Sequence, residues 1–176
     1  MKRRENGFTL LELSVVLALS ATIALTTTIF SFHAFNTTAR TASHLTAVAN
    51  VDNAGYWVSR DGVMADDVIT SNLTAPAILI LKWTDWGYGT DNIYYSATYS
   101  IENLSGGIGQ LKRELQSSNG IEQHLNLASN IYYDPADAAN STTVAHVGSV
   151  INLRVASRFG NASETRNYQI HPRPNF

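Results

Sequence analysis

Cysteine is absent from the 176 residues, and charged residues make up only 15% of them. Without cysteine the chain has neither a disulfide nor a thiolate metal ligand, so its fold must rely on packing. Typical globular domains contain about 25% charged residues. The low charge and a pI near 6.2 argue against a strong phosphate-binding surface, so the sequence carries no strong signal for a nucleic-acid partner.

Catalytic and metal-binding motifs are also missing. The chain contains no GxSxG or HExxH motif, so we expect neither an enzyme nor a cofactor. Asp85 and Asp91 flank a turn with two glycines, as in a cation-binding loop. However, the turn lacks the further oxygen ligands of a calcium loop. The two residues are therefore weak calcium candidates, and a simple turn is the competing interpretation. The histidines are scattered along the chain and form no ligand pair, so no zinc site is expected. They are His33, His44, His124, His146 and His171.

Formal charge is absent from residues 13–39, and residues 13–35 are mostly Val, Leu, Ala, Ile, Phe and Thr. A membrane core of about 30 Å is spanned by about 20 mostly apolar helical residues. The stretch is therefore long enough to cross a membrane. Its Ser and Thr hydroxyls are expected to bond to carbonyls one turn earlier, which keeps the helix intact and provides a surface for packing against other helices.

Basic residues are concentrated before this stretch. Lys2, Arg3 and Arg4 precede it, whereas Arg40 is the basic residue that soon follows. Because an excess of Lys and Arg stays on the cytoplasmic side, we expect a cytoplasmic N-terminus and an extracytoplasmic C-terminal part.

A carboxylate, Glu12, stands at the head of the apolar stretch. A secretory signal cleaved after residues 18–20 would place Glu12 inside its apolar core and leave residues 23–35 unexplained. A plain uncleaved anchor explains the length and the charges but gives Glu12 no role. An acidic side chain deep in a membrane helix costs about 2.5–3.5 kcal/mol on insertion scales.

The basic leader, followed by Gly7-Phe8-Thr9-Leu10-Leu11-Glu12, resembles the N-terminal signal of type IV prepilins and of the pseudopilins of type II secretion and DNA-uptake machines. The resemblance implies that a prepilin peptidase cleaves between Gly7 and Phe8 and methylates the new N-terminus of Phe8. It also implies that Glu12 pairs with the first-residue amine of a neighbouring subunit during assembly. The implied partners are that peptidase, other pilin subunits, membrane lipid, a platform protein and an assembly ATPase.

Beyond the apolar stretch, hydrophobic residues continue at steps of three and four, which predicts an amphipathic helix to about Asp67. The expected stripe is Phe35, Ala39, Ala42, Leu45, Val48, Val51, Ala54 or Gly55, and Val58. No proline interrupts residues 8–35. Many major pilins carry one there, so its absence favours a minor subunit.

The remaining sequence predicts strands separated by turns. Residues 93–101 alternate strictly, and residues 134–143 are predicted to form an exposed loop. The other expected strands are 77–83, 108–115, 130–134, 144–159 and 165–171, the last two forming a hairpin around Gly160-Asn161. A long helix followed by an antiparallel sheet is an α+β fold, and it is the pilin fold in the resembling family.

We therefore expect a leader at 1–7, a transmembrane and assembly helix at 8–35, an amphipathic helix at 36–70 and an extracytoplasmic sheet domain at 71–176. Arg60-Asp61 and the C-terminal residues 150–175 also resemble J-type minor pseudopilins and W-type minor pilins. The competing hypothesis is a membrane-anchored binding or adhesion protein that does not polymerise. The aromatic residues could then form a stacking surface, although their positions along strands favour core packing.

Overall fold

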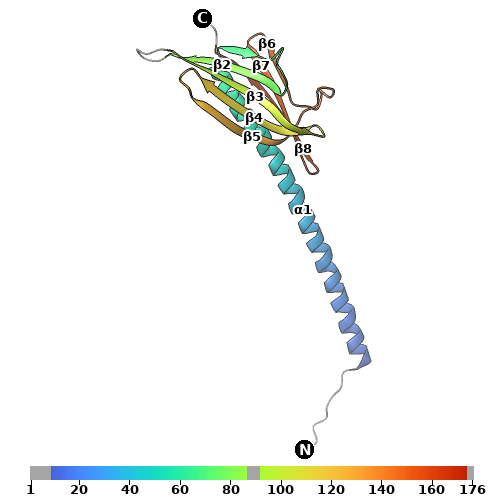
Figure 1. Cartoon of the computed structure of the whole chain (residues 1–176). Helices are drawn as coiled ribbons and strands as arrows, with labels where there is room; N and C mark the ends of the chain where they lie inside the picture. The colour runs from blue at the N-terminus through green and yellow to red at the C-terminus, as the bar shows by residue number, and fades with distance from the viewer. Residues whose placement is uncertain (1–8, 87–91, 174–176) are drawn as a thin grey trace, which may run out of the picture. The chain divides into compact units, whose positions relative to one another are not determined.

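The computed structural model describes residues 9–86 and 92–173 (Figure 1). The chain divides into two compact units, Met1–Thr41 and Ala42–Phe176. The described elements are α1 (Leu10–Met64), β1 (Asp67–Ile69), β2 (Ala77–Asp85), β3 (Ile93–Ser105), β4 (Ile108–Ser117), β5 (Glu122–Tyr132), β6 (Thr143–Val147), β7 (Val150–Phe159) and β8 (Ala162–Ile170). The expected α+β fold, with one long N-terminal helix and an antiparallel sheet, is confirmed.

The first unit contributes the apolar start of α1. Its large side chains are exposed, with Leu10 at 86% and Phe30 at 76%. Among the described residues, α1 is the one helix long and apolar enough to cross a membrane. The Thr22 and Thr28 hydroxyls donate to the carbonyls of Ala18 and Ala24, each at 2.8 Å. This confirms that hydroxyls in the stretch bond within the helix and leave it continuous.

In the second unit, the rest of α1 packs on the sheet. Its buried residues are Ala47, Val51, Ala54, Gly55, Val58, Asp61 and Gly62. The expected stripe is therefore confirmed from Val51 to Val58. It is wrong at Leu45, which is 61% exposed, and at Phe35, which is 77% exposed. The buried side chains are small because the sheet approaches closely: a Cβ on Gly55 would lie 2.1 Å from the Tyr168 ring.

The sheet has eight strands in the order β1-β2-β3-β4-β5-β7-β6, and β8 also pairs with β7. All pairings in the described part are antiparallel. β8 lines one edge of β7 along its whole length. The other edge pairs first with β6 and then, through Ser157, with Ile131 of β5. β7 thus pairs with three strands, β5, β6 and β8.

The helix end and the first strand correct the expected boundaries. α1 ends at Met64 rather than near Asp67, and β1 lies inside the range expected to be helical, 36–70. The Asp66 amide donates to the Lys82 carbonyl at 2.8 Å. Pairing with β2 thus replaces the last helical turn, an outcome that helical periodicity does not reveal.

Two further strand predictions are wrong in extent. Residues 144–159 form two strands, because the chain turns at Gly148-Ser149, where Gly148 adopts a positive φ of 62°. A glycine-serine pair between apolar runs is a signal for such a two-residue hairpin. β5 begins at Glu122 rather than near Asn130. Its first residues are polar, so they gave no alternation to recognise.

The loop at 134–143 is not exposed throughout. Ser141 and Thr142 are each 1% exposed. Ser141 Oγ accepts a hydrogen bond from the Asp134 amide at 2.7 Å, and Thr142 Oγ1 accepts one from the Ala156 amide at 3.0 Å. These hydroxyls satisfy buried backbone groups, so the end of the loop is fixed to β7.

Candidate functional site

The start of α1 is closed by a reciprocal pair of hydrogen bonds between Thr9 and Glu12. The Thr9 amide donates to Glu12 Oε2 at 2.9 Å, and the Glu12 amide donates to Thr9 Oγ1 at 3.3 Å. The Thr9 hydroxyl also donates to Glu12 Oε2 at 3.0 Å. The Thr9 carbonyl accepts the first helical bond, from Leu13, at 3.2 Å. Thr9 is therefore the N-cap of a capping box.

The capping box gives Glu12 a local partner that the sequence interpretation missed. The spacing Thr-x-x-Glu before an apolar run is its sequence signal, and residues 9–12 carry it. Both hydrogen bonds accepted by the carboxylate go to Oε2. Oε1 accepts none from the described residues and can take a further donor, such as an ammonium group, while the cap stays closed. The positive end of the helix dipole also favours an acid here.

The other residues predicted to act in processing and topology are Lys2, Arg3, Arg4, Gly7 and Phe8. They lie outside the described residues.

Of the two weak calcium candidates, one is among the described residues. Asp85 is exposed at the end of β2, and Asp91 lies outside the described residues. Within those residues Asp85 belongs to no cluster of three potential metal ligands.

A protein-family model described as the prokaryotic N-terminal methylation motif matches residues 2–28. The match supports the resemblance of the chain to the type IV pilin and pseudopilin family. No curated protein and no solved structure matches the chain. With the apolar start of α1, the motif supports membrane anchoring of this pilin-like protein. At the family level it also implies processing by prepilin peptidase and contact with other pilin subunits.

A second polar site anchors α1 to the sheet of the pilin-like domain. Asp61 is fully buried, and Arg113 of β4 is 3% exposed. Arg113 Nε and Nη2 donate to the two Asp61 carboxylate oxygens at 2.6 and 3.1 Å. Tyr99 Oη donates to Asp61 Oδ2 at 2.6 Å. Asp61 belongs to the Arg60-Asp61 pair that the sequence singled out. Its partners come from β3 and β4 and had no sequence signal.

The opposite charges of Asp61 and Arg113 balance each other in this buried site. Burial disfavours the charged guanidinium of Arg113, but the hydrogen bonds and charge of Asp61 outweigh it and raise the pKa of Arg113. Burial and the adjacent Asp61 carboxylate raise the pKa of Tyr99, so its phenol stays protonated and donates. The Trp57 ring lies 5.1 Å from the guanidinium carbon of Arg113 and 5.0 Å from that of Arg60. The cluster therefore links α1 to the sheet without a free buried charge.

The aromatic residues divide between core and surface. Tyr99 and Tyr132 are buried, as expected for core packing. Trp83 and Tyr95 stack with ring centroids 5.4 Å apart and line a surface groove of about 400 Å³. Tyr94 is 59% exposed beside them. The expected preference for core packing therefore holds for only part of the aromatic set.

Proposed function

We propose that the chain is a minor pilin or pseudopilin that assembles through the start of α1. It is inserted with its N-terminus in the cytoplasm, held there by Lys2, Arg3 and Arg4. Prepilin peptidase cleaves between Gly7 and Phe8 and methylates Phe8. Residues 1–7 are then the removed leader, and residues 8–35 form the membrane and assembly helix. The sheet domain lies outside the cytoplasm, in a filament of the cell surface or the periplasm.

The observation that carries this proposal is the methylation motif at residues 2–28, which runs directly into α1. The capping box adds support, because it holds the Glu12 carboxylate at the helix start with Oε1 available. Cleavage before Phe8 creates an ammonium group close to this position. An ion pair between that group and Glu12 of a neighbouring subunit lowers the cost of both charges in the membrane. The pair would also fix the axial register between subunits.

Filament growth is driven by a platform protein and an assembly ATPase in this proposal. The Arg60-Asp61 pair near the helix end supports a J-type or W-type minor subunit. The system served could be a type IV pilus, type II secretion or DNA uptake.

The deciding experiment is mass spectrometry of the mature N-terminus. The full chain is produced with and without a co-expressed prepilin peptidase. The proposal expects loss of residues 1–7 and one added methyl group on Phe8 only when the peptidase is present. An intact Met1 under both conditions would support a simple anchor, and a new N-terminus at Ala21 would support a secreted domain.

The second candidate is a membrane-anchored binding or adhesion protein that does not polymerise. The groove lined by Trp83 and Tyr95 favours it, because apolar grooves with a few polar groups are common binding sites. Crosslinking in membranes separates the two candidates. Ladders of crosslinked subunits through the start of α1 support the pilin, and monomers alone support the anchored binding protein.

A further inference from the structure

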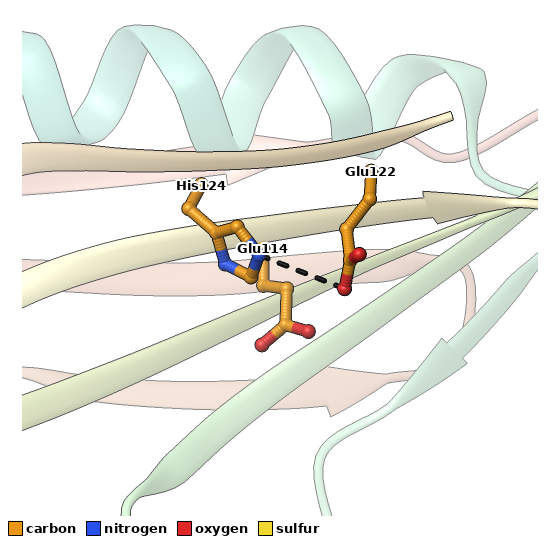
Figure 2. Close-up of side chains that lie close together, drawn as sticks. All are labelled: Glu114, Glu122 and His124. Carbon is orange, nitrogen blue, oxygen red and sulfur yellow. Dashed lines mark ion pairs between the residues drawn. The ribbon is translucent and has the colours of Figure 1, made fainter. Parts of the chain in front are cut away.

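Three metal-ligating side chains gather on one face of β4 and β5: Glu114, Glu122 and His124 (Figure 2). Glu114 lies directly opposite His124 in the antiparallel register. Glu122 precedes His124 by two residues and therefore points to the same side of the strand. Arg113 precedes Glu114 and bonds to Asp61 of α1, so it faces the helix. Its partner Gln123 lies between Glu122 and His124. Because alternate residues point to opposite sides of a strand, the three potential ligands lie on the outer face of the sheet.

The distances suit a small metal ion. His124 Nε2 and Glu122 Oε1 are 3.6 Å apart, longer than a hydrogen bond. The three potential ligand atoms all lie within 4.8 Å of one another. Two ligands each about 2.1 Å from a tetrahedral Zn²⁺ are roughly 3.4 Å apart. The imidazole and the Glu122 carboxylate are thus close to ligand spacing, and a small side-chain adjustment brings Glu114 to the same point.

A neighbouring glutamine orients Glu114, and the two carboxylates have no Lys or Arg partner in the described part of the chain. Gln116 Nε2 donates to Glu114 Oε1 at 2.7 Å, which leaves Oε2 available as a ligand. Lys112 also lies on this face, but it is bound to Glu102 at 2.6 Å. In the described part of the chain neither Glu114 nor Glu122 forms an ion pair with Lys or Arg. A divalent cation would relieve the repulsion between the two carboxylates.

The ligand types select among metals. Calcium and magnesium prefer oxygen ligands alone, whereas an imidazole with carboxylates suits zinc and related transition metals. Zinc is held by three protein ligands with water in the fourth position in catalytic sites, so three side chains suffice to hold the ion. We propose that Glu114, Glu122 and His124 bind one Zn²⁺ ion on the outer face of the sheet, with water as the fourth ligand. The site is independent of N-terminal processing.

The test is calorimetric titration of the full, metal-free chain in detergent with ZnCl2. The expected result is one Zn²⁺ per chain. Loss of an outer partner of a ligand typically weakens metal affinity about 10–100-fold. We therefore expect Glu114→Gln, Glu122→Gln and His124→Gln each to weaken it at least about tenfold. All three positions are on the sheet surface, and unchanged circular dichroism will show that each variant folds.

His146→Gln is the matched control, because it removes an exposed imidazole from β6 of the same sheet. Its affinity for Zn²⁺ is expected to equal that of the unaltered chain. Titration with CaCl2 tests the choice of metal, and weaker binding than for Zn²⁺ is expected. The proposal is overturned by an absence of saturable Zn²⁺ binding, by affinity that survives all three ligand substitutions, or by equal affinity for Ca²⁺.

Discussion

The two parts of α1 are both rich in apolar residues, yet these residues are mostly exposed in the first part and are buried along one stripe in the second. In residues 10–41 large side chains such as Leu10 and Phe30 are mostly exposed, whereas Ala47, Val51 and Ala54 in the later part are completely buried. Small residues allow a sheet to approach the helix, and bulky ones provide the apolar surface that a membrane requires. The same helix therefore serves anchoring in one part and folding in the other.

The two parts of α1 are expected to respond most strongly, and in different ways, to loss of their carboxylates, Glu12 in the first part and Asp61 in the second. Glu12→Ala removes the proposed partner of the Phe8 ammonium group, and an unpaired charge in a membrane costs about 2.5–3.5 kcal/mol on insertion scales. We expect cleavage to remain intact and assembly to fall roughly a hundredfold. Filament yield and N-terminal mass report the two effects. Assembly at the original level by cleaved Glu12→Ala would contradict the role given to Glu12.

Asp61→Ala makes the matching change in the later part. It leaves Arg113 charged and unpaired in the core, which typically costs about 3–5 kcal/mol. Urea unfolding of the full chain in detergent measures the effect. Asp52→Ala is the control, because Asp52 pairs with Arg166 at an exposed position of the same helix, where such pairs contribute under about 1 kcal/mol. Equal losses of unfolding free energy in the two variants would contradict the distinction between the buried Asp61–Arg113 pair and the exposed Asp52–Arg166 pair.

Alkaline pH is expected to weaken the sheet domain through Tyr99. Its folded pKa is raised above the ordinary tyrosine value of about 10. The unfolded chain therefore loses this proton first, and stability is full below about pH 10 and falls as the pH rises further. Tyr99→Phe should reduce this slope in unfolding experiments. It should not abolish it, because burial also raises the pKa of Tyr168.

Thr9→Ala tests the capping box at the start of the helix. Loss of an N-cap hydroxyl typically costs about 1 kcal/mol of helix stability. Hydrogen exchange of the first-turn amides should accelerate, whereas the unfolding midpoint of the sheet domain should not change. Thr9→Ser keeps the hydroxyl and should behave like the unaltered chain. Slow exchange in Thr9→Ala would mean that the cap is dispensable.

The smallest effect on unfolding free energy is expected at the part of the predicted apolar stripe that the sheet does not cover. Leu45 is 61% exposed, so Leu45→Ser should change unfolding by no more than about 0.5 kcal/mol. Val51→Ala, two turns later and fully buried, should cost more because it leaves a cavity. A larger loss for Leu45→Ser would show that residue 45 is covered in the folded chain.

Much of the fold was predictable because the apolar pattern has a local cause. The uncharged stretch, the stripe from Val51 to Val58 and the turn at Gly160-Asn161 all follow from spacing within one segment. The division of residues 144–159 into two strands was also predictable from Gly148-Ser149, but these residues were interpreted as one continuous strand. The early start of β5 was not, because Glu122 and His124 are polar and become strand residues through pairing with β4.

The candidate sites divide in the same way. The Thr9–Glu12 cap lies within four residues and has a recognisable motif. The contact between Asp61 and Arg113, and the approach of Glu114 to His124, depend on strand register, which residue types alone do not specify. A scattered set of histidines and acids therefore gave no indication of the zinc ligands.

The threonine hydroxyls near the middle of the apolar stretch have a further consequence. Thr22, Thr27 and Thr28 each donate to a carbonyl of their own helix. Transfer of the segment from a lipid environment to a bundle of protein helices breaks none of these bonds. In the proposed filament, the helix could therefore slide past its neighbours with these threonine hydroxyls already bonded, as extension or disassembly of a fibre requires.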